Sequence, residues 1–187
     1  MKFIKIIITI IVIIIFVISA LYNKSTKEEV SPKKWKSEKI TQEVFTELIE
    51  EFGGDKRNIS YNKRHDFLRN PETGRKLELD MMYSDGIMNI AVEYQGKQHT
   101  EFPNYFYPDT ELGRSNFEAL QRRDRCKKKL CEENNVCLIE VPYTCDTCDY
   151  LNNRYVYNSQ INITEKRRRI KEYLIPRINQ CLINFQD

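Results

Sequence analysis

The chain of 187 residues is long enough for one domain with a modest hydrophobic core. Its 30 lysines and arginines nearly balance 27 aspartates and glutamates. Net charge therefore gives no support for a nucleic-acid partner, and only local clusters of basic residues can indicate one. Six cysteines in this length fall short of the density of a small secreted disulfide scaffold.

The cysteines are expected to be free thiols. Cys145 and Cys148 form the only C-x-x-C sequence, and a zinc site would need a second pair of ligands. We therefore expect no zinc, and a disulfide within this loop is the alternative to free thiols.

The N-terminal segment is apolar. From Ile6 to Tyr22 only Thr9 and Ser19 are polar, and a helix of 17–20 residues would span about 25–30 Å, roughly one hydrocarbon core. We expect residues 1–22 to be a single transmembrane anchor that contacts the membrane through residues 3–22. Residues 23–36 are then a linker and residues 37–187 the folded domain.

The lysines after this apolar run outnumber those before it, which predicts a cytoplasmic location for the C-terminal domain. A cleaved signal peptide, which would make the domain secreted or lumenal, is the alternative.

A helix is predicted for residues 37–52, because their apolar residues fall on one stripe and two glycines follow. Residues 55–75 are predicted to be mainly loop, with a short strand near residues 59–61 and a turn at residues 71–74.

The loop before the turn is locally basic. Arg64, Arg69 and Arg75 are candidate contacts to nucleic-acid phosphates. Ordinary solvation of a surface loop explains the same residues.

Residues 75–99 are predicted to form a β-hairpin with two different faces, because apolar and polar residues alternate on both sides of a turn at residues 84–86. Side chains that lie opposite in an antiparallel pair share a face. This holds whether Asp80 pairs with Ala91 across a tight turn or with Glu93 across a looser loop. The polar face then gathers Glu78, Asp80, Glu93 and Gln95.

Three carboxylates on one sheet face repel one another unless a cation or solvent lies among them. One interpretation is an ordinary half-exposed hairpin with its acids in water. The other is a set of oxygen ligands for a hard divalent cation such as Mg²⁺, which one or two carboxylates hold together with water and phosphate. In that case Asp80 and Glu93 are the metal ligands, and Glu78 supports them.

Residues 102–109 form a loop rich in aromatic residues between two prolines. These side chains are expected to pack beneath the loop. Covering the site or stacking on bases, as in single-strand binders, is the alternative.

A helix is predicted for residues 114–134. One side carries Asp124 and Lys127 among apolar residues, where charged groups require partners. The two residues could form a buried ion pair, or Lys127 could reach a scissile phosphate while Asp124 binds His99. The outward side suits a DNA backbone, although a solvated helix face has the same composition; its basic residues include Arg122, Arg123, Arg125 and Lys128.

Residues 136–143 are predicted to form a central strand, parallel to one strand of the hairpin, because they are almost continuously apolar. Residues 145–157 are predicted to be loop. A last helix is predicted to begin near Thr164.

At this level the sequence resembles a known family. Phe67–Tyr83, Val92–His99 and Arg122–Cys131 are similar to segments of the PD-(D/E)xK nucleases. The similarity is greatest to the branch near the very-short-patch-repair endonucleases, which includes proteins of large DNA viruses. The resemblance covers about residues 41–143 and implies an α/β (α+β) restriction-endonuclease-like fold. Such a fold has an αβββαβ core, in which a mixed sheet is flanked by helices.

The resemblance also implies DNA as the substrate and Mg²⁺ or Mn²⁺ as the cofactor. Asp80 and Glu93 would bind the metal ion. A lysine two residues after the glutamate normally orients the attacking water, but this chain has Gln95 there. Lys97 or Lys127 would then supply the positive charge.

Two further roles follow from the resemblance. His99 would act as a general base or contact a metal-bound water, as histidines do in short-patch-repair relatives. A glutamate of the first helix would reach the metal, and Glu43 is the matching residue, with Glu47 as the alternative. Lys97 is also a candidate DNA contact.

Three functions remain open from the sequence. The first is a membrane-tethered, metal-dependent DNA endonuclease. The second is a nuclease-fold protein that has lost catalysis and binds nucleic acid or a protein partner. The third is an unrelated interaction domain whose acids and cysteines serve structure.

Overall fold

A computed structural model describes residues 32–185. The chain divides into residues 1–36 and residues 37–187, and the second unit contains the sheet. The elements of the described residues in chain order are α2 (Pro32–Glu51), η1 (Lys56–Asn58), β1 (Ile59–Arg69), β2 (Lys76–Ser84), β3 (Asn89–Gln95), η2 (Lys97–His99), α3 (Glu111–Glu133), β4 (Cys137–Pro142), α4 (Thr144–Thr147), β5 (Cys148–Leu151), β6 (Arg154–Tyr157) and α5 (Ile163–Asn184).

The predicted anchor at residues 1–22 and most of the linker lie outside the described residues. Among residues 32–185, no helix combines the length and the apolar character needed to cross a bilayer.

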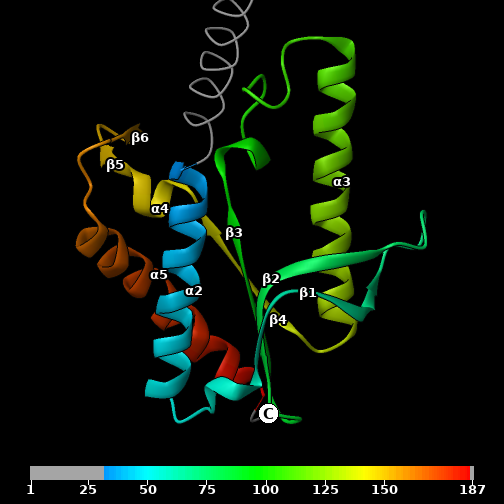
Figure 1. The fold of residues 1–187 in the computed structure, drawn as a ribbon, viewed down its shortest axis with the longest axis vertical. Coiled ribbons are helices and arrows are strands. Elements are labelled where there is room, and N and C mark those ends of the chain that lie inside the picture. The colour runs from blue at the N-terminus through cyan, green and yellow to red at the C-terminus, as the bar shows by residue number, and fades with distance from the viewer. Residues whose placement is uncertain (1–31, 186–187) are drawn as a thin grey trace, which may run out of the picture. The chain divides into compact units, whose positions relative to one another are not determined.

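Four strands form one mixed sheet in the order β1-β2-β3-β4 (Figure 1). The first three are antiparallel neighbours, and β4 lies parallel to β3. Parallel neighbours need a long crossover connection, and α3 provides it. The predicted hairpin and the predicted parallel strand are therefore confirmed.

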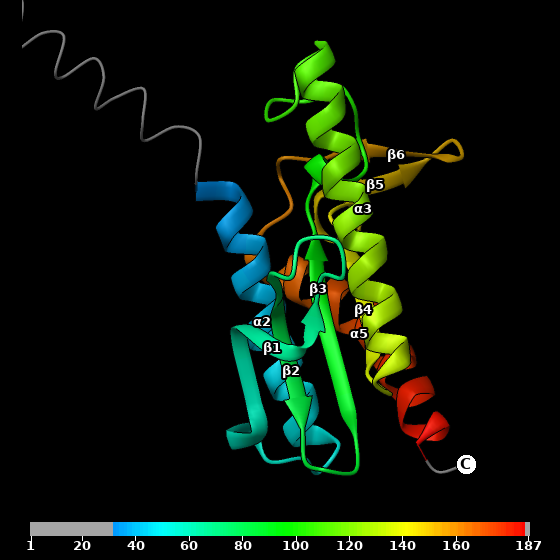
Figure 2. The same cartoon turned by 90° about the vertical axis from the view of Figure 1, so that its right-hand side faces the viewer.

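Helices cover both faces of this sheet. Figures 1 and 2 show α2 and α5 on one face and α3 on the other. The larger core packs α2 and α5 against the sheet and includes Phe45, Val92 and Leu174. The smaller core packs α3 against the sheet and includes Ala91 and Cys131. Together these layers give a mixed α/β domain.

The prediction of a mainly loop-like segment at residues 55–75 is wrong, because β1 runs from Ile59 to Arg69. Most of β1 is exposed or half-buried, since it is an edge strand. Such a strand needs no apolar alternation and is held by its pairing with β2. The predicted turn at residues 71–74 is present, and Gly74 adopts a positive φ of 66° there.

The prediction of a loop at residues 145–157 is also wrong. After the short helix α4, β5 and β6 form a small antiparallel hairpin. Its two turn residues, Asn152 and Asn153, have φ angles of 50° and 60°. A two-residue hairpin turn with both residues at positive φ favours asparagine and glycine, so Asn152-Asn153 was the signal that could have located this turn.

The expectation of free thiols fails for two cysteines. Cys137 in β4 and Cys181 in α5 form a disulfide, with their Cα atoms 5.9 Å apart and a sequence separation of 44. Spacing gave no sign of this pairing because it depends on how α5 packs on the sheet. Cys126, Cys131, Cys145 and Cys148 are free, as predicted.

Candidate active site and basic groove

Asp80 of β2 and Glu93 of β3 come together on the sheet. The β2–β3 ladder ends at the pair Met81–Val92, and Asp80 and Glu93 are the next residues along the two strands, which matches the looser-loop alternative. Here the carboxylates bond the backbone of the facing strand. The Asp80 N–H donates to Glu93 Oε1 at 3.1 Å, and the Tyr94 N–H donates to Asp80 Oδ2 at 2.8 Å.

Lys127 of α3 reaches the same point from the helix. Its Nζ lies 2.6 Å from Glu93 Oε2, and the two side chains are only 14% and 5% exposed. Burial raises the pKa of Glu93 to about 7 despite the nearby Lys127, and the charge of Asp80 adds to the rise. Burial also lowers the pKa of Lys127, but the negative charges around it outweigh this and raise its pKa. Near neutral pH the cluster therefore holds a readily lost proton on Glu93.

His99 and Asp124 form a second pair beside the first. His99 Nδ1 lies 2.7 Å from Asp124 Oδ2, and both side chains are largely buried. Asp124 precedes Lys127 by three residues, so both project from the same side of α3. Of the two expectations for this helix face, the contact of Asp124 with His99 is present, whereas Lys127 pairs with Glu93 and not with Asp124. The bond fixes the ring and makes Nε2 the nitrogen that can exchange a proton with a substrate.

Gln95 lies where the family pattern has lysine. Its Nε2 donates to Glu140 Oε1 at 3.2 Å. Its Oε1 is buried without a hydrogen-bond partner, and no other buried side-chain nitrogen or oxygen of the described residues shares this condition. A buried polar atom without a partner costs about 1–3 kcal/mol. The Oε1 atom is therefore suited to accept from a water or to contact a cation.

Four other predicted residues lie elsewhere. Glu78 is exposed and pairs with Arg64 at 3.3 Å. Glu43 pairs with Arg167 of α5 at 2.7 Å, so the structure does not bring it to Asp80 and Glu93. Glu47 pairs with the same arginine at 2.5 Å. Lys97 is exposed and pairs with Glu101 at 2.9 Å, which leaves Lys127 as the lysine at the carboxylates.

Among residues 32–185, no group of three or more His, Cys, Asp or Glu side chains is arranged to hold a metal ion. A metal at this site would therefore depend on Asp80 and Glu93, with water and a substrate phosphate completing its shell. Magnesium is commonly bound in this way.

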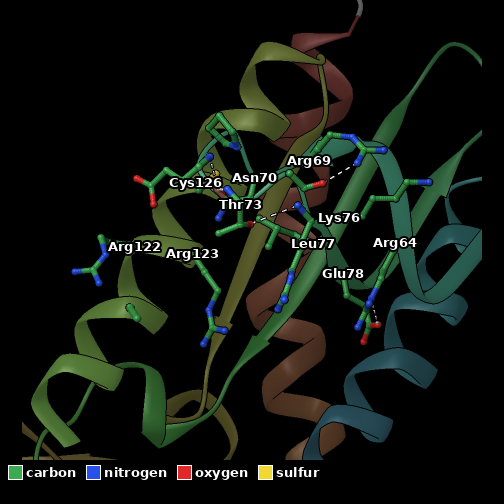
Figure 3. Close-up of a pocket in the computed structure, with 15 residues that line it drawn as sticks. Arg64, Arg69, Asn70, Thr73, Lys76, Leu77, Glu78, Arg122, Arg123 and Cys126 are labelled. Atoms are coloured by element: carbon green, nitrogen blue, oxygen red, sulfur yellow. Dashed lines mark hydrogen bonds and ion pairs between the residues drawn. The ribbon is translucent and has the colours of Figure 1, made fainter. Parts of the chain in front are cut away.

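A basic groove of about 880 Å³ lies between α3 and the β1–β2 hairpin (Figure 3). Arg122 and Arg123 line it from α3, and the turn at residues 71–74 lines it from the hairpin. Six of its lining residues are basic and two are acidic. The basic ones are Arg64, Arg69, Arg75, Lys76, Arg122 and Arg123, and the acidic ones are Glu72 and Glu78.

The groove adjoins the carboxylate site through both of its walls. Glu78 precedes Asp80 by two residues on β2, and Arg123 precedes Lys127 by four residues on α3. Five of the predicted nucleic-acid contacts therefore line the same groove, although they are spread over 60 residues of the sequence. The other three, Lys97, Arg125 and Lys128, are exposed and do not line the groove.

A further buried polar network was missed in the sequence. Asp146 of α4 is 0% exposed, and its carboxylate binds Lys166 Nζ at 3.0 Å and the Tyr94 hydroxyl at 2.9 Å. Lys166 also donates to Ser37 Oγ at 3.2 Å. Tyr94 stands between Glu93 and Gln95 on β3, so this network fixes the strand that carries the site. An aspartate inside a C-x-x-C sequence gave no sign of burial.

Comparisons with known proteins find relatives in viruses. Over 83 residues the chain is 43% identical to uncharacterised protein 033L of Invertebrate iridescent virus 3, covering 44% of this chain and 40% of that protein. Over 101 residues it is 44% identical to uncharacterised protein 307L of Invertebrate iridescent virus 6, covering 50% and 48%. Over 81 residues it is 43% identical to uncharacterised protein 094L of Frog virus 3, covering 43% and 49%.

The matched region therefore spans less than half the length of these relatives. No family model matches the chain, and no solved structure matches it.

Proposed function

We propose that the domain is a metal-dependent endonuclease of the PD-(D/E)xK type, which hydrolyses DNA phosphodiester bonds. The observation that carries the proposal is the convergence of Asp80, Glu93 and Lys127 beside a groove lined by six basic residues. The order α2-β1-β2-β3-α3-β4 also supports the αβββαβ core that the resemblance implies.

The residues present fit a divalent cation. Two neighbouring carboxylates, one with a raised pKa, form a site whose negative charge a cation would compensate. The buried Gln95 Oε1 atom offers a further oxygen that has no donor. Mg²⁺ or Mn²⁺ held by Asp80 and Glu93 would polarise the phosphodiester and lower the pKa of a bound water.

The chain's own residues supply the rest of the chemistry. Lys127 brings positive charge to the point where charge develops on the phosphate, in place of the lysine that Gln95 replaces. His99, oriented by Asp124, is placed to take a proton from the attacking water. Arg69, Arg75 and the α3 arginines bind phosphates that flank the one attacked.

The test is a nicking assay with the full chain in detergent, using supercoiled plasmid and a series of Mg²⁺, Mn²⁺ and Ca²⁺. We expect cleavage with Mg²⁺ or Mn²⁺ that Asp80→Ala abolishes. The matched control is Glu43→Ala, because this exposed glutamate pairs with α5; it should retain cleavage.

The second candidate is a catalytically weak or inactive nuclease-fold protein that binds nucleic acid or a protein partner. Two observations favour it: Gln95 carries no charge, and Lys127 already occupies Glu93 Oε2. Salt-sensitive DNA binding without cleavage under any of the metals would select this function.

Membrane tethering is also part of the proposal. It is supported by the apolar run from Ile6 to Tyr22, which lies outside the described residues. The lysine distribution around the run favours a cytoplasmic domain.

A further inference from the structure

Exposed apolar side chains concentrate at one end of the domain. Thirteen large apolar side chains are exposed in the described residues, and eight of them lie in residues 105–112 or in the hairpin β5–β6. These eight are Tyr105, Phe106, Leu112, Tyr150, Leu151, Tyr155, Val156 and Tyr157. Figures 1 and 2 show both segments at the end of the domain where α2 begins, which is the upper end in each view.

Contacts with α3 and α5 hold this surface in place. In the loop, Phe102 and Tyr107 stack against Phe117 of α3 at 5.4 and 6.0 Å between ring centroids, so the exposed Tyr105 and Phe106 are carried on a packed base. In the hairpin, Arg169 donates to the Cys148 carbonyl and pairs with Asp149, both at 2.7 Å. The exposed side chains are therefore presented by fixed elements.

The chemistry of the surface favours a lipid interface over nucleic acid. Tyr150, Tyr155 and Tyr157 are 62%, 61% and 57% exposed. Tyrosine has an apolar ring and a polar tip, and it is enriched where hydrocarbon meets headgroups. The basic groove that suits phosphates lies between α3 and the β1–β2 hairpin, away from this surface.

The described domain also begins at this end. Lys166 binds Ser37 near the start of α2 and Asp146 beside β5, so the first turns of α2 lie close to the hairpin. Only nine residues separate Tyr22, the end of the apolar run, from Pro32, the first residue of α2. Nine residues reach at most about 30 Å when fully extended. A tether this short gives the domain an effective concentration of about millimolar at the bilayer surface. Even a weak contact between the domain and the bilayer then forms.

We propose that the β5–β6 hairpin and residues 105–112 contact the headgroup region of the bilayer in which residues 3–22 are anchored. The groove and the carboxylate site on the α3 side then remain accessible from solvent. This inference rests on the membrane-anchoring part of the proposed function and is independent of DNA cleavage.

The experiment uses the full chain reconstituted in vesicles of phosphatidylcholine and phosphatidylserine. A photoreactive benzoylphenylalanine replaces Tyr155 in one variant and Ile87 in the control. Ile87 is 78% exposed and lies in the β2–β3 turn, at the opposite end of the domain. We expect lipid adducts at position 155 to exceed those at position 87 at least fivefold by mass spectrometry, and the same probe at Tyr150 repeats the measurement.

Three results would overturn the inference. The lipid adducts could be equal at positions 155 and 87, or absent at positions 150 and 155. The probes at positions 150 and 155 could also crosslink to a second chain or to added DNA. Vesicle flotation is measured on the same samples. Flotation without adducts refutes the contact but leaves the anchor, and a chain that does not float refutes both. Plasmid nicking is read separately and tests only the nuclease.

Discussion

Lys127 of α3 and Glu93 of β3 form a largely buried ion pair, with 2.6 Å between Nζ and Oε2, although they are 34 positions apart in sequence. In the motif that the sequence resembles, the lysine follows the glutamate on the same strand. Here the strand has Gln95, and a helix delivers the charge. The proposed nuclease would thus preserve the charge at the site while changing the element that supplies it.

Removing this lysine should affect both activity and stability. Lys127→Met should lower cleavage by about 10²–10³-fold, because one preorganised electrostatic group at the reacting centre is removed. It should also destabilise the domain by up to about 3–5 kcal/mol, since Glu93 remains buried without its partner. Urea unfolding and the nicking assay measure the two effects. The double variant Glu93→Gln/Lys127→Met should regain much of the stability and none of the activity; a double variant less stable than Lys127→Met would contradict the pairing.

Stability should depend on pH through Glu93. The pKa of its carboxyl is near 4.5 in the unfolded chain and about 7 in the folded domain, so between these values the folded state holds a proton that the unfolded state has released. Stability should therefore fall by up to about 3 kcal/mol as pH rises from 4.5 to 7, and this loss should level off above 7. Chemical unfolding in EDTA across this range checks it, and Glu93→Gln should remove that part of the slope.

The groove should account for the salt dependence of DNA binding. Arg122→Ala/Arg123→Ala should weaken binding to a duplex and reduce the slope of log K against log salt by about 0.9 for each phosphate that the variant no longer neutralises. Arg125→Ala is the matched control, because it is exposed on the same helix outside the groove. Equal weakening in both variants, measured by fluorescence anisotropy at several salt concentrations, would place the DNA elsewhere.

Reduction of the disulfide should destabilise the domain. Cys137 and Cys181 enclose a loop of 44 residues, and removing a cross-link of this size costs about 2–4 kcal/mol. Cys137→Ser/Cys181→Ser should therefore show a lower melting temperature that dithiothreitol does not lower further. The wild-type chain should respond to dithiothreitol, and so should a Cys126→Ser control, since Cys126 is free.

The buried network around Asp146 should contribute to stability from the face opposite α3. Asp146→Ala leaves the Lys166 ammonium without its carboxylate partner in a site where Asp146 is 0% exposed, and we expect a loss of about 3–5 kcal/mol. Asp149→Ala removes a partly exposed partner of Arg169 and should cost much less, because water already screens this pair. Thermal melts of the two variants compare them directly, and similar losses would show that burial does not set the cost.

The sequence predicted the elements in which apolar residues follow a recognisable pattern along the chain. The hairpin and α3 have apolar residues at the spacing of two or of 3.6, β4 is almost continuously apolar, and all three are present. The approach of Asp80 to Glu93 and the contact of Asp124 with His99 were each one of two alternatives that the sequence left open. Leu79 and Met81 lie two residues apart on β2 but pack in different cores, so strict alternation of the two faces fails at Asp80.

The features that could not be predicted depend on contacts between segments far apart in sequence, or on strand pairing alone. β1 is an exposed edge strand, so its residues carry no apolar period. The disulfide and the Asp146 network both need α5 in position against the sheet. The groove needs β1–β2 and α3 to face each other, which no local pattern specifies.

The position of α3 links recognition with chemistry. This one helix carries Arg122 and Arg123 in the groove wall, Asp124 against His99 and Lys127 at Glu93. A helix moves as a rigid rod, so a duplex that pulls on the arginines would displace the ammonium group by a similar amount. Binding of DNA in the groove and the position of Lys127 at the carboxylates would then be coupled through the movement of α3.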